Sequence, residues 1–203
     1  MPAIILTLIA VLIYASPTLT EALQWTRGDD AISSLWTAHL THWTSGHLLW
    51  DAVMFAVFGL IATRVFGLRL LATFFIAAPV IALGVAHWAP ELTSYRGLSG
   101  IDTLLVVFVS LKILCDAKQA RSIRVAAITL LLGLAGKTLF EAMTHGALFA
   151  GDLGPGVTTV PLAHLIGGTI GAALALLPTP LVRMKKSPPQ RGLCIAKQCG
   201  DGG

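Results

Sequence analysis

The chain has 203 residues, of which 55% are hydrophobic and only 12% charged, and its mean hydropathy is +0.79. Soluble domains are about 25% charged, so this composition excludes an ordinary water-soluble fold and predicts an integral membrane protein. The formal charge of +4 is carried by short loops and the C-terminal tail, which argues against nucleic-acid binding.

Six apolar stretches have the length of membrane-spanning helices. They cover residues 4–23, 47–66, 70–88, 98–114, 125–143 and 160–181. We interpret the first as a retained span and not a cleaved signal peptide, because no Lys or Arg precedes it and Pro17 follows the plausible cleavage point. The fold class predicted is therefore an all-α membrane protein, a six-helix bundle over residues 1–182.

The segments between the spans differ in character. Residues 24–46 are polar and rich in tryptophan, which indicates a partly helical segment along the membrane interface. Pro79 lies in the middle of the third span, where a neighbouring element is expected to bond the carbonyl that proline leaves free. Residues 144–159 form a glycine-rich loop, and the basic tail 183–203 is expected to be mostly disordered.

The three cysteines give no binding motif. Cys115 ends the fourth predicted span, and the tail pair Cys194 and Cys199 has a spacing that matches no strong zinc or redox pattern. We expect unpaired thiols on a reducing side of the membrane, no metal and no cofactor.

The positive charges predict the orientation of the bundle. Arg64 and Arg69, the cations between residues 112 and 124, and five Lys or Arg in the tail all fall on one side of a six-span topology. The positive-inside rule then places both termini in the cytoplasm.

The fourth span is short and begins with Ser99 between Gly97 and Gly100. Its 17 residues reach about 25 Å, which is less than a bilayer core of about 30 Å. If the helix begins below the outer surface, Ser99 lies within the membrane and needs a water-filled cavity. In the predicted topology His47 and His164 lie near the same outer face, and ionisable groups inside membranes suggest function.

The sixth span predicts how Ser99 meets a base. His164, Gly167 and Gly171 follow at i, i+3 and i+7, so they share one helix face, and Gly168 with Ala172 widens this seam. The residues at the start of the fourth span also have small side chains. Packing the two surfaces together would place His164 beside Ser99, and a serine hydroxyl becomes a nucleophile when such a base removes its proton.

Each feature alone has a simpler interpretation. Small residues in membrane helices usually mean close packing, and a histidine at a span end is more often interfacial. Lys137 and Glu141, at i and i+4 near the end of the fifth span, are interpreted as a snorkelling ion pair and not as a proton relay.

Three motifs together resemble the rhomboid family of intramembrane serine proteases. They are Gly97-Leu98-Ser99-Gly100, His164-x-x-Gly167-x-x-x-Gly171 and His42-x4-His47-x3-Asp51. The resemblance implies a six-span core, a Ser99–His164 dyad without a third acid, and oxyanion support from His47, Asp51 and Gly97. It also implies a cavity open to the exterior, lined by Gly100, Asp102, Thr103, Gly167 and Gly171.

The segments 47–51 and 95–100 further resemble the rhombosortase subgroup. This implies a bacterial inner-membrane enzyme whose site opens to the periplasm. Its substrates would be exported proteins held in the bilayer by transmembrane or C-terminal anchors of the Gly-Gly type. The alternative is a catalytically inactive rhomboid-like protein that binds transmembrane helices, and a third interpretation is a small transporter or channel.

Two positions depart from the general rhomboid pattern. Asp51 stands where most rhomboids carry asparagine, and we expect it to be either protonated or turned away to orient His47. Thr103 stands where many rhomboids have an aromatic residue that stacks on the histidine. The neighbouring Asp102 is a second unusual acid, which either bonds near His164 or lines the cavity.

Overall fold

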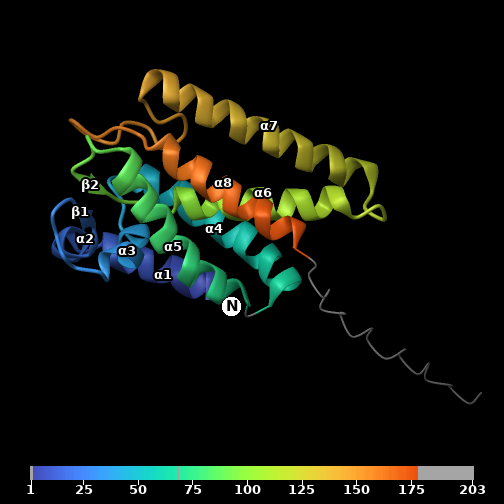
Figure 1. The fold of residues 1–203 in the computed structure, drawn as a ribbon, viewed down its shortest axis with the longest axis horizontal. Coiled ribbons are helices and arrows are strands. Elements are labelled where there is room, and N and C mark those ends of the chain that lie inside the picture. The colour runs from blue at the N-terminus through green and yellow to red at the C-terminus, as the bar shows by residue number, and fades with distance from the viewer. Residues whose placement is uncertain (1, 68, 178–203) are drawn as a thin grey trace, which may run out of the picture.

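The structure of the chain is a computed structural model that describes residues 2–67 and 69–177 (Figure 1). This part of the chain is almost wholly helical. The α-helices are α1 (Pro2–Tyr14), α2 (Pro17–Leu23), α3 (Ser34–Thr37), α4 (Ser45–Phe66), α5 (Arg69–Trp88), α6 (Ser99–Cys115), α7 (Arg121–Thr144) and α8 (Pro161–Leu176). They are joined by a 3-10 turn, η1 (Ala38–Leu40), and by two short strands, β1 (Trp25–Thr26) and β2 (Ser94–Tyr95).

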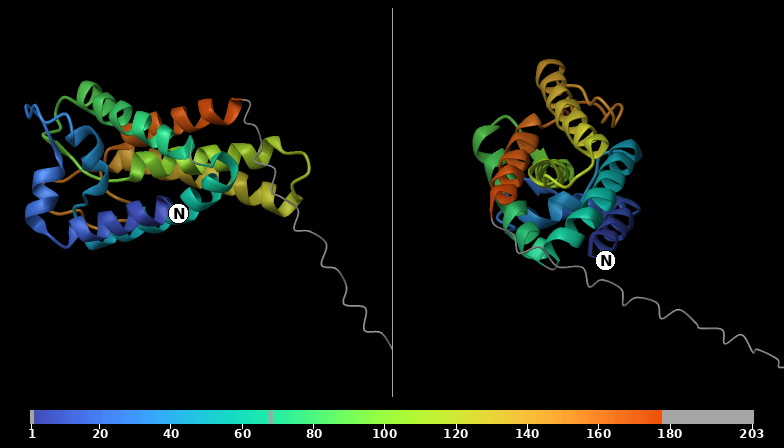
Figure 2. Two further views of the ribbon diagram at one scale, coloured as in Figure 1. Left: turned by 90° about the horizontal axis from the view of Figure 1, so that it is seen from below. Right: turned by 90° about the vertical axis from the view of Figure 1, so that its right-hand side faces the viewer.

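Helix α6 forms the centre of the bundle. Viewed end-on, it lies among α4, α5, α7 and α8 (Figure 2). Ten of its 17 residues are buried, and α8 packs most closely against it. Helix α7 is peripheral, because only Ala127 and Glu141 are buried along its 24 residues. The all-α prediction is therefore confirmed, with a core built around α6.

Three helices, α4, α5 and α7, are long and apolar enough to cross a membrane. The bent pair α1 and α2 makes a fourth span if it is counted as one, and α8 is apolar but shorter. These helices indicate a membrane protein, as the composition predicted.

The predicted first span, residues 4–23, consists of two helices in the structure. The chain breaks after Tyr14, and the axes of α1 and α2 differ by 114°. Pro17 is the first residue of α2, and the residue before a proline is disfavoured in helical conformation. Ser16 is accordingly extended, and its hydroxyl accepts a hydrogen bond from the Leu19 amide as the cap of α2.

The other predicted helices differ mainly at their ends. Helix α4 starts two residues early because the Thr44 hydroxyl accepts a hydrogen bond from the His47 amide. Helix α7 starts at Arg121, so Arg121 and Arg124 lie on the helix and not in the preceding loop. The predicted tail, 183–203, with its two cysteines, lies outside the described residues.

Pro79 lies inside α5, as predicted. Proline has no amide hydrogen, so the carbonyl four residues earlier, that of Phe75, loses its helical partner. The indole Nε1–H of Trp36 donates a hydrogen bond to this carbonyl at 2.8 Å. The expectation that a neighbouring element would satisfy the carbonyl is confirmed.

Residues 24–46 are partly helical, as predicted, but their strand pairing was not foreseen. Strand β1 pairs antiparallel with β2, which lies about 70 residues later and leads into the Ser99 turn. The guanidinium of Arg27 donates hydrogen bonds to the carbonyls of Ala86, Ala89 and Leu92 at the end of α5. These contacts fasten the segment before Ser99 to the rest of the bundle.

His39, in η1 outside the spanning helices, joins this segment to α5. Its ring nitrogens lie 2.9 Å from the Ala78 carbonyl and 3.3 Å from the Gly97 carbonyl. Burial disfavours the imidazolium and lowers the pKa of His39 to about 4, although both carbonyls oppose this shift. His39 is therefore neutral in the folded chain at neutral pH.

This burial predicts a loss of stability in acid. Between pH 6.5 and about 4 the unfolded chain binds a proton at His39 that the folded chain excludes, so the free energy of unfolding falls as pH falls. The loss is about 1.4 kcal/mol per pH unit and roughly 3 kcal/mol in all. Unfolding in detergent, followed from pH 7 to pH 4, measures this slope.

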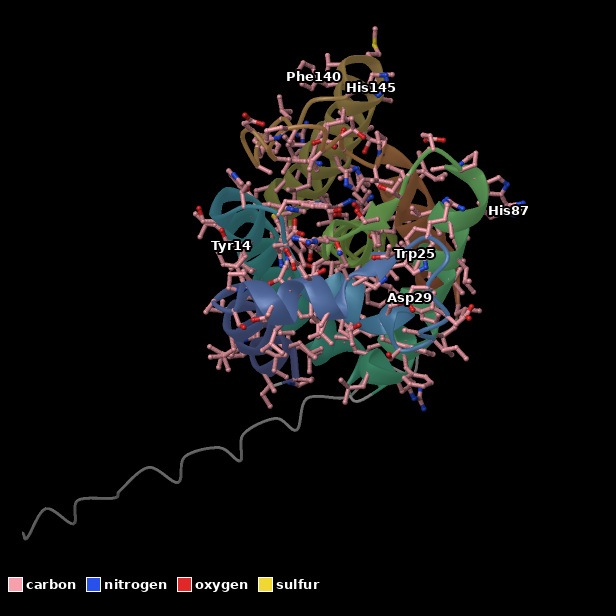
Figure 3. All side chains as sticks on the ribbon, turned by 90° about the vertical axis from the view of Figure 1, so that its left-hand side faces the viewer. Tyr14, Trp25, Asp29, His87, Phe140 and His145 are labelled. Carbon is pink, nitrogen blue, oxygen red and sulfur yellow. The ribbon has the colours of Figure 1, made fainter. Side chains whose placement is uncertain are left out.

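A His39→Gln variant should have a shallower slope over the same range. The matched control is His87→Gln, since His87 is exposed at the outer end of α5 (Figure 3). This control should keep the wild-type slope. Equal slopes in all three proteins would contradict the assignment to His39.

Candidate functional site

A cavity of about 630 Å³ lies between α4, α6, α7 and α8. The polar side chains predicted from the sequence all line it: His47, Asp51, Ser99, Asp102, Thr103 and His164. They come from three helices and from positions more than 100 residues apart. The structure therefore brings the predicted nucleophile, the predicted base and two of the predicted support residues to one cavity. The other predicted positions do not line it: Gly97, Gly100, Gly167 and Gly171.

Ser99 is the first residue of α6 and is half-buried at the cavity wall. The turn before it is fixed from two sides. The Gly97 amide donates to the Ala38 carbonyl at 3.1 Å, and the Leu98 amide donates to Oδ2 of Asp51 at 2.9 Å. The first amides of a helix have no partner within the helix, so the Ser99 amide is a donor at the same place as the hydroxyl.

The predicted seam between α8 and α6 is confirmed. A Cβ atom added at Gly167 would overlap the Gly100 carbonyl, and one at Gly171 would overlap the Leu104 carbonyl. Gly168 has only ordinary contacts, with side chains of α6. The two backbones thus touch where α8 carries glycine, and this contact places His164, one turn before Gly167, at the cavity.

Asp51 is the centre of a buried cluster. Its Oδ2 atom lies 3.2 Å from Nε2 of His42 and 3.3 Å from Nε2 of His47, besides accepting from the Leu98 amide. The two imidazole rings meet edge to face with centroids 5.1 Å apart. Of the two expectations for Asp51, these contacts match the one in which its carboxylate orients His47.

The two residues after the Ser99 turn behave differently. The Thr103 hydroxyl donates to the Ser99 carbonyl at 2.8 Å, so it is engaged within α6. Asp102 is buried, and neither of its carboxylate oxygens has a hydrogen-bond partner among the described residues. Asp102 therefore lines the cavity, and the alternative in which it bonds near His164 has no contact to support it.

A second acid, Glu141 of α7, approaches the predicted base. Its Oε2 atom lies 2.7 Å from Nζ of Lys137, which confirms the predicted ion pair, but also 3.4 Å from Nδ1 of His164. Glu141 is only 2% exposed, so it does not snorkel to the surface as expected. The sequence shows the Lys137 spacing but carries no signal for the contact with His164, because that contact depends on how α7 is rotated.

The loop between α7 and α8 also lines the cavity. Phe149 of this loop packs on Trp50 of α4 with ring centroids 5.0 Å apart. A Cβ atom at Gly46 would lie 2.7 Å from the Ala150 carbonyl, so the loop also touches the start of α4. Figure 3 shows the end of α7, with Phe140 and His145, at the outer edge of the molecule from which this loop begins.

Among the described residues no group of three His, Cys, Asp or Glu side chains is arranged to hold a metal ion. Comparison of the chain with models of protein families gives no match, and comparison with curated proteins gives none either.

Proposed function

We propose that the chain is an intramembrane serine endopeptidase of the rhomboid type, with Ser99 as nucleophile and His164 as base. The observation that carries the proposal is the contact of Gly167 and Gly171 with the backbone of α6, which sets His164 and Ser99 against one cavity. A structural role for the glycines alone would not require a serine and a buried histidine at the same opening.

The proposed reaction has two steps at this cavity. Oγ of Ser99 attacks a peptide carbonyl while His164 accepts the hydroxyl proton, and the carbonyl oxygen becomes an oxyanion. His164 then gives the proton to the leaving amine as the C–N bond breaks, which leaves an acyl-enzyme. Polar side chains on the wall of this largely apolar cavity admit water for hydrolysis of the acyl-enzyme, at a depth where lipid would exclude it.

The oxyanion has two candidate donors. One is the Ser99 amide at the N-terminus of α6, which the helix dipole favours. The other is His47, whose Nε2 faces Asp51; with one proton held on Nε2, the unpartnered Nδ1 can donate to the oxyanion only when the ring carries both protons. In this proposal Asp51 acts through His47 and through the Leu98 amide, and does not itself face the oxyanion.

The finer features of the proposal come from the sequence. They are a six-span bundle in a bacterial inner membrane, both termini in the cytoplasm and a site that opens to the periplasm. The resemblance to rhombosortases suggests cleavage of exported proteins near a C-terminal Gly-Gly-type anchor. A reporter with such an anchor, compared with one anchored at its N-terminus, separates this substrate class from other membrane proteins, and mass spectrometry of the new C-terminus identifies the bond.

Labelling with a fluorophosphonate probe tests the proposed nucleophile. We expect the folded, detergent-solubilised chain to be labelled and a Ser99→Ala variant to lose all labelling above background. The matched control is Ser110→Ala, on the same helix, because this buried hydroxyl has no hydrogen-bond partner among the described residues and does not line the cavity.

Labelling of the Ser110→Ala variant should equal that of the wild type. A folded wild-type chain that resists the probe at every pH would overturn the proposal. It would favour the alternative of an inactive rhomboid-like protein that binds transmembrane helices.

A further inference from the structure

The proposed dyad leaves one buried carboxylate beside His164 without a role, that of Glu141. Glu141 is 2% exposed and His164 is 5% exposed, and Oε2 of Glu141 lies 3.4 Å from Nδ1 of His164, an ion-pair distance at which Nδ1 makes no hydrogen bond to the described residues. Both residues line the cavity that holds Ser99. The acid, the histidine and the serine therefore all line one cavity.

The carboxylate of Glu141 is fixed by its other neighbours. Oε2 receives a hydrogen bond of 2.7 Å from Lys137, and Oε1 receives one of 3.2 Å from the Leu148 amide. Burying a carboxylate costs several kcal/mol unless such donors compensate it. With one donor on each oxygen, the carboxylate is held in place, with Oε2 toward Nδ1 of His164.

The position of this acid decides which nitrogen of His164 is a base. A neutral imidazole carries one proton, and an acceptor at one nitrogen draws the proton to that nitrogen. Glu141 faces Nδ1, so it favours the tautomer that is protonated there and leaves the lone pair of Nε2 for another partner. Ser99 needs a base with such a free lone pair.

We propose that Glu141 is a positioning residue for His164, so that the site operates as Ser99–His164–Glu141 and not as a dyad. The inference rests on the proposed function of Ser99. During attack the Ser99 proton moves to Nε2 of His164, and the Nδ1 proton stays between His164 and Glu141. The carboxylate takes up no proton; it stabilises the imidazolium until His164 passes the proton to the leaving amine.

Other ionisable groups surround Glu141 and His164, and they include both basic and acidic side chains. Those that face His164 from the packed helices are Lys137 and Glu141 on α7, His47 and Asp51 on α4, and Asp102 on α6. Helix α5 carries its titratable groups, Arg69 and His87, at its two ends. Glu141 is the acid that the structure places at ion-pair distance from His164.

A Glu141→Gln variant tests the inference. The glutamine keeps the shape of the side chain but can donate to Nδ1, which favours the wrong tautomer. We expect kcat for an anchored reporter to fall at least about 100-fold with KM nearly unchanged, and fluorophosphonate labelling to slow in parallel. Glu141→Asp, which keeps the charge, should recover part of the loss. The control Glu21→Gln makes the same change on an exposed residue outside the cavity and should leave both rates unchanged.

A direct reading of the tautomer does not depend on the activity of any variant. Nitrogen NMR of ring-labelled histidine in the full wild-type chain, with His164→Asn used to assign the signal, should show a protonated Nδ1 on His164. A proton on Nε2, or a folded Glu141→Gln variant with wild-type kcat, would overturn the inference. If Ser99 is not labelled in the wild type, the proposed function itself fails, so the two failures are distinguishable.

Discussion

Replacement of Gly167 by alanine is expected to disrupt both folding and chemistry. The added Cβ would overlap the carbonyl of Gly100, and a backbone atom cannot move aside as a flexible side chain can. Overpacking of this kind costs about 3 kcal/mol or more, and here it also pushes α8, with His164, away from α6. Thermal unfolding in detergent should show a midpoint lower by roughly 5–10 °C, with loss of fluorophosphonate labelling.

The adjacent Gly168 provides a matched control for this prediction. A Cβ atom there would lie 3.5 Å from the Thr103 methyl carbon and 3.7 Å from a Val107 methyl, which are ordinary contacts. Alanine is also better than glycine inside a helix by about 0.5–1 kcal/mol. Gly168→Ala should therefore be as stable as the wild type or slightly more stable. If Gly167→Ala and Gly168→Ala had equal effects, this would contradict the close backbone contact between α8 and α6 at Gly167.

Replacement of Gly97 by alanine should damage the site more than the fold. Gly97 has φ +122, where a side chain is strained by about 1–3 kcal/mol. Its Cβ would also lie 2.8 Å from Nε2 of His47 and 3.4 Å from Oδ2 of Asp51. The ring must then move off the carboxylate. A displacement of about 1 Å at a catalytic group lowers rates roughly 100-fold, and the rate of Ser99 labelling measures it.

A variant at Gly28 separates the effect of backbone strain from the effect of the contact with His47. This residue has φ +85 in the turn after β1, and a Cβ atom there meets nothing within 4 Å. Gly28→Ala should therefore lose only the stability that backbone strain accounts for, about 1–3 kcal/mol, and keep its labelling rate. If Gly97→Ala also labels at the wild-type rate, the contact with His47 has no role in the chemistry.

The sequence predicted those parts of the structure that depend on short-range spacing. Apolar runs located the long helices, and the i, i+3, i+7 spacing of His164, Gly167 and Gly171 predicted the face that meets α6. The i+4 spacing of Lys137 and Glu141 predicted their ion pair. In each case the relevant residues belong to one helix, where the geometry follows from 3.6 residues per turn.

Contacts between elements were missed because they depend on how helices are rotated and where chains turn. The approach of Glu141 to His164 requires a particular rotation of α7 about its axis. The hydrogen bond from the Leu98 amide to Asp51 requires the turn that β1 and β2 hold in place. Pro17 gave a local signal for an interruption of the first span, but the size of the bend, 114°, depends on how α1 and α2 pack on the other helices.

The distribution of burial gives the site an uneven local stability. Ser99 and the glycine seam belong to α6 and α8, the most closely packed pair, whereas Glu141 belongs to α7, of which little is buried. Native-state openings begin where the fewest contacts are broken, so α7 should exchange its amide hydrogens sooner than α6. Bilayer thickness and detergent act first on such an outer helix. They would alter the distance between acid and histidine while the serine and the histidine stay together.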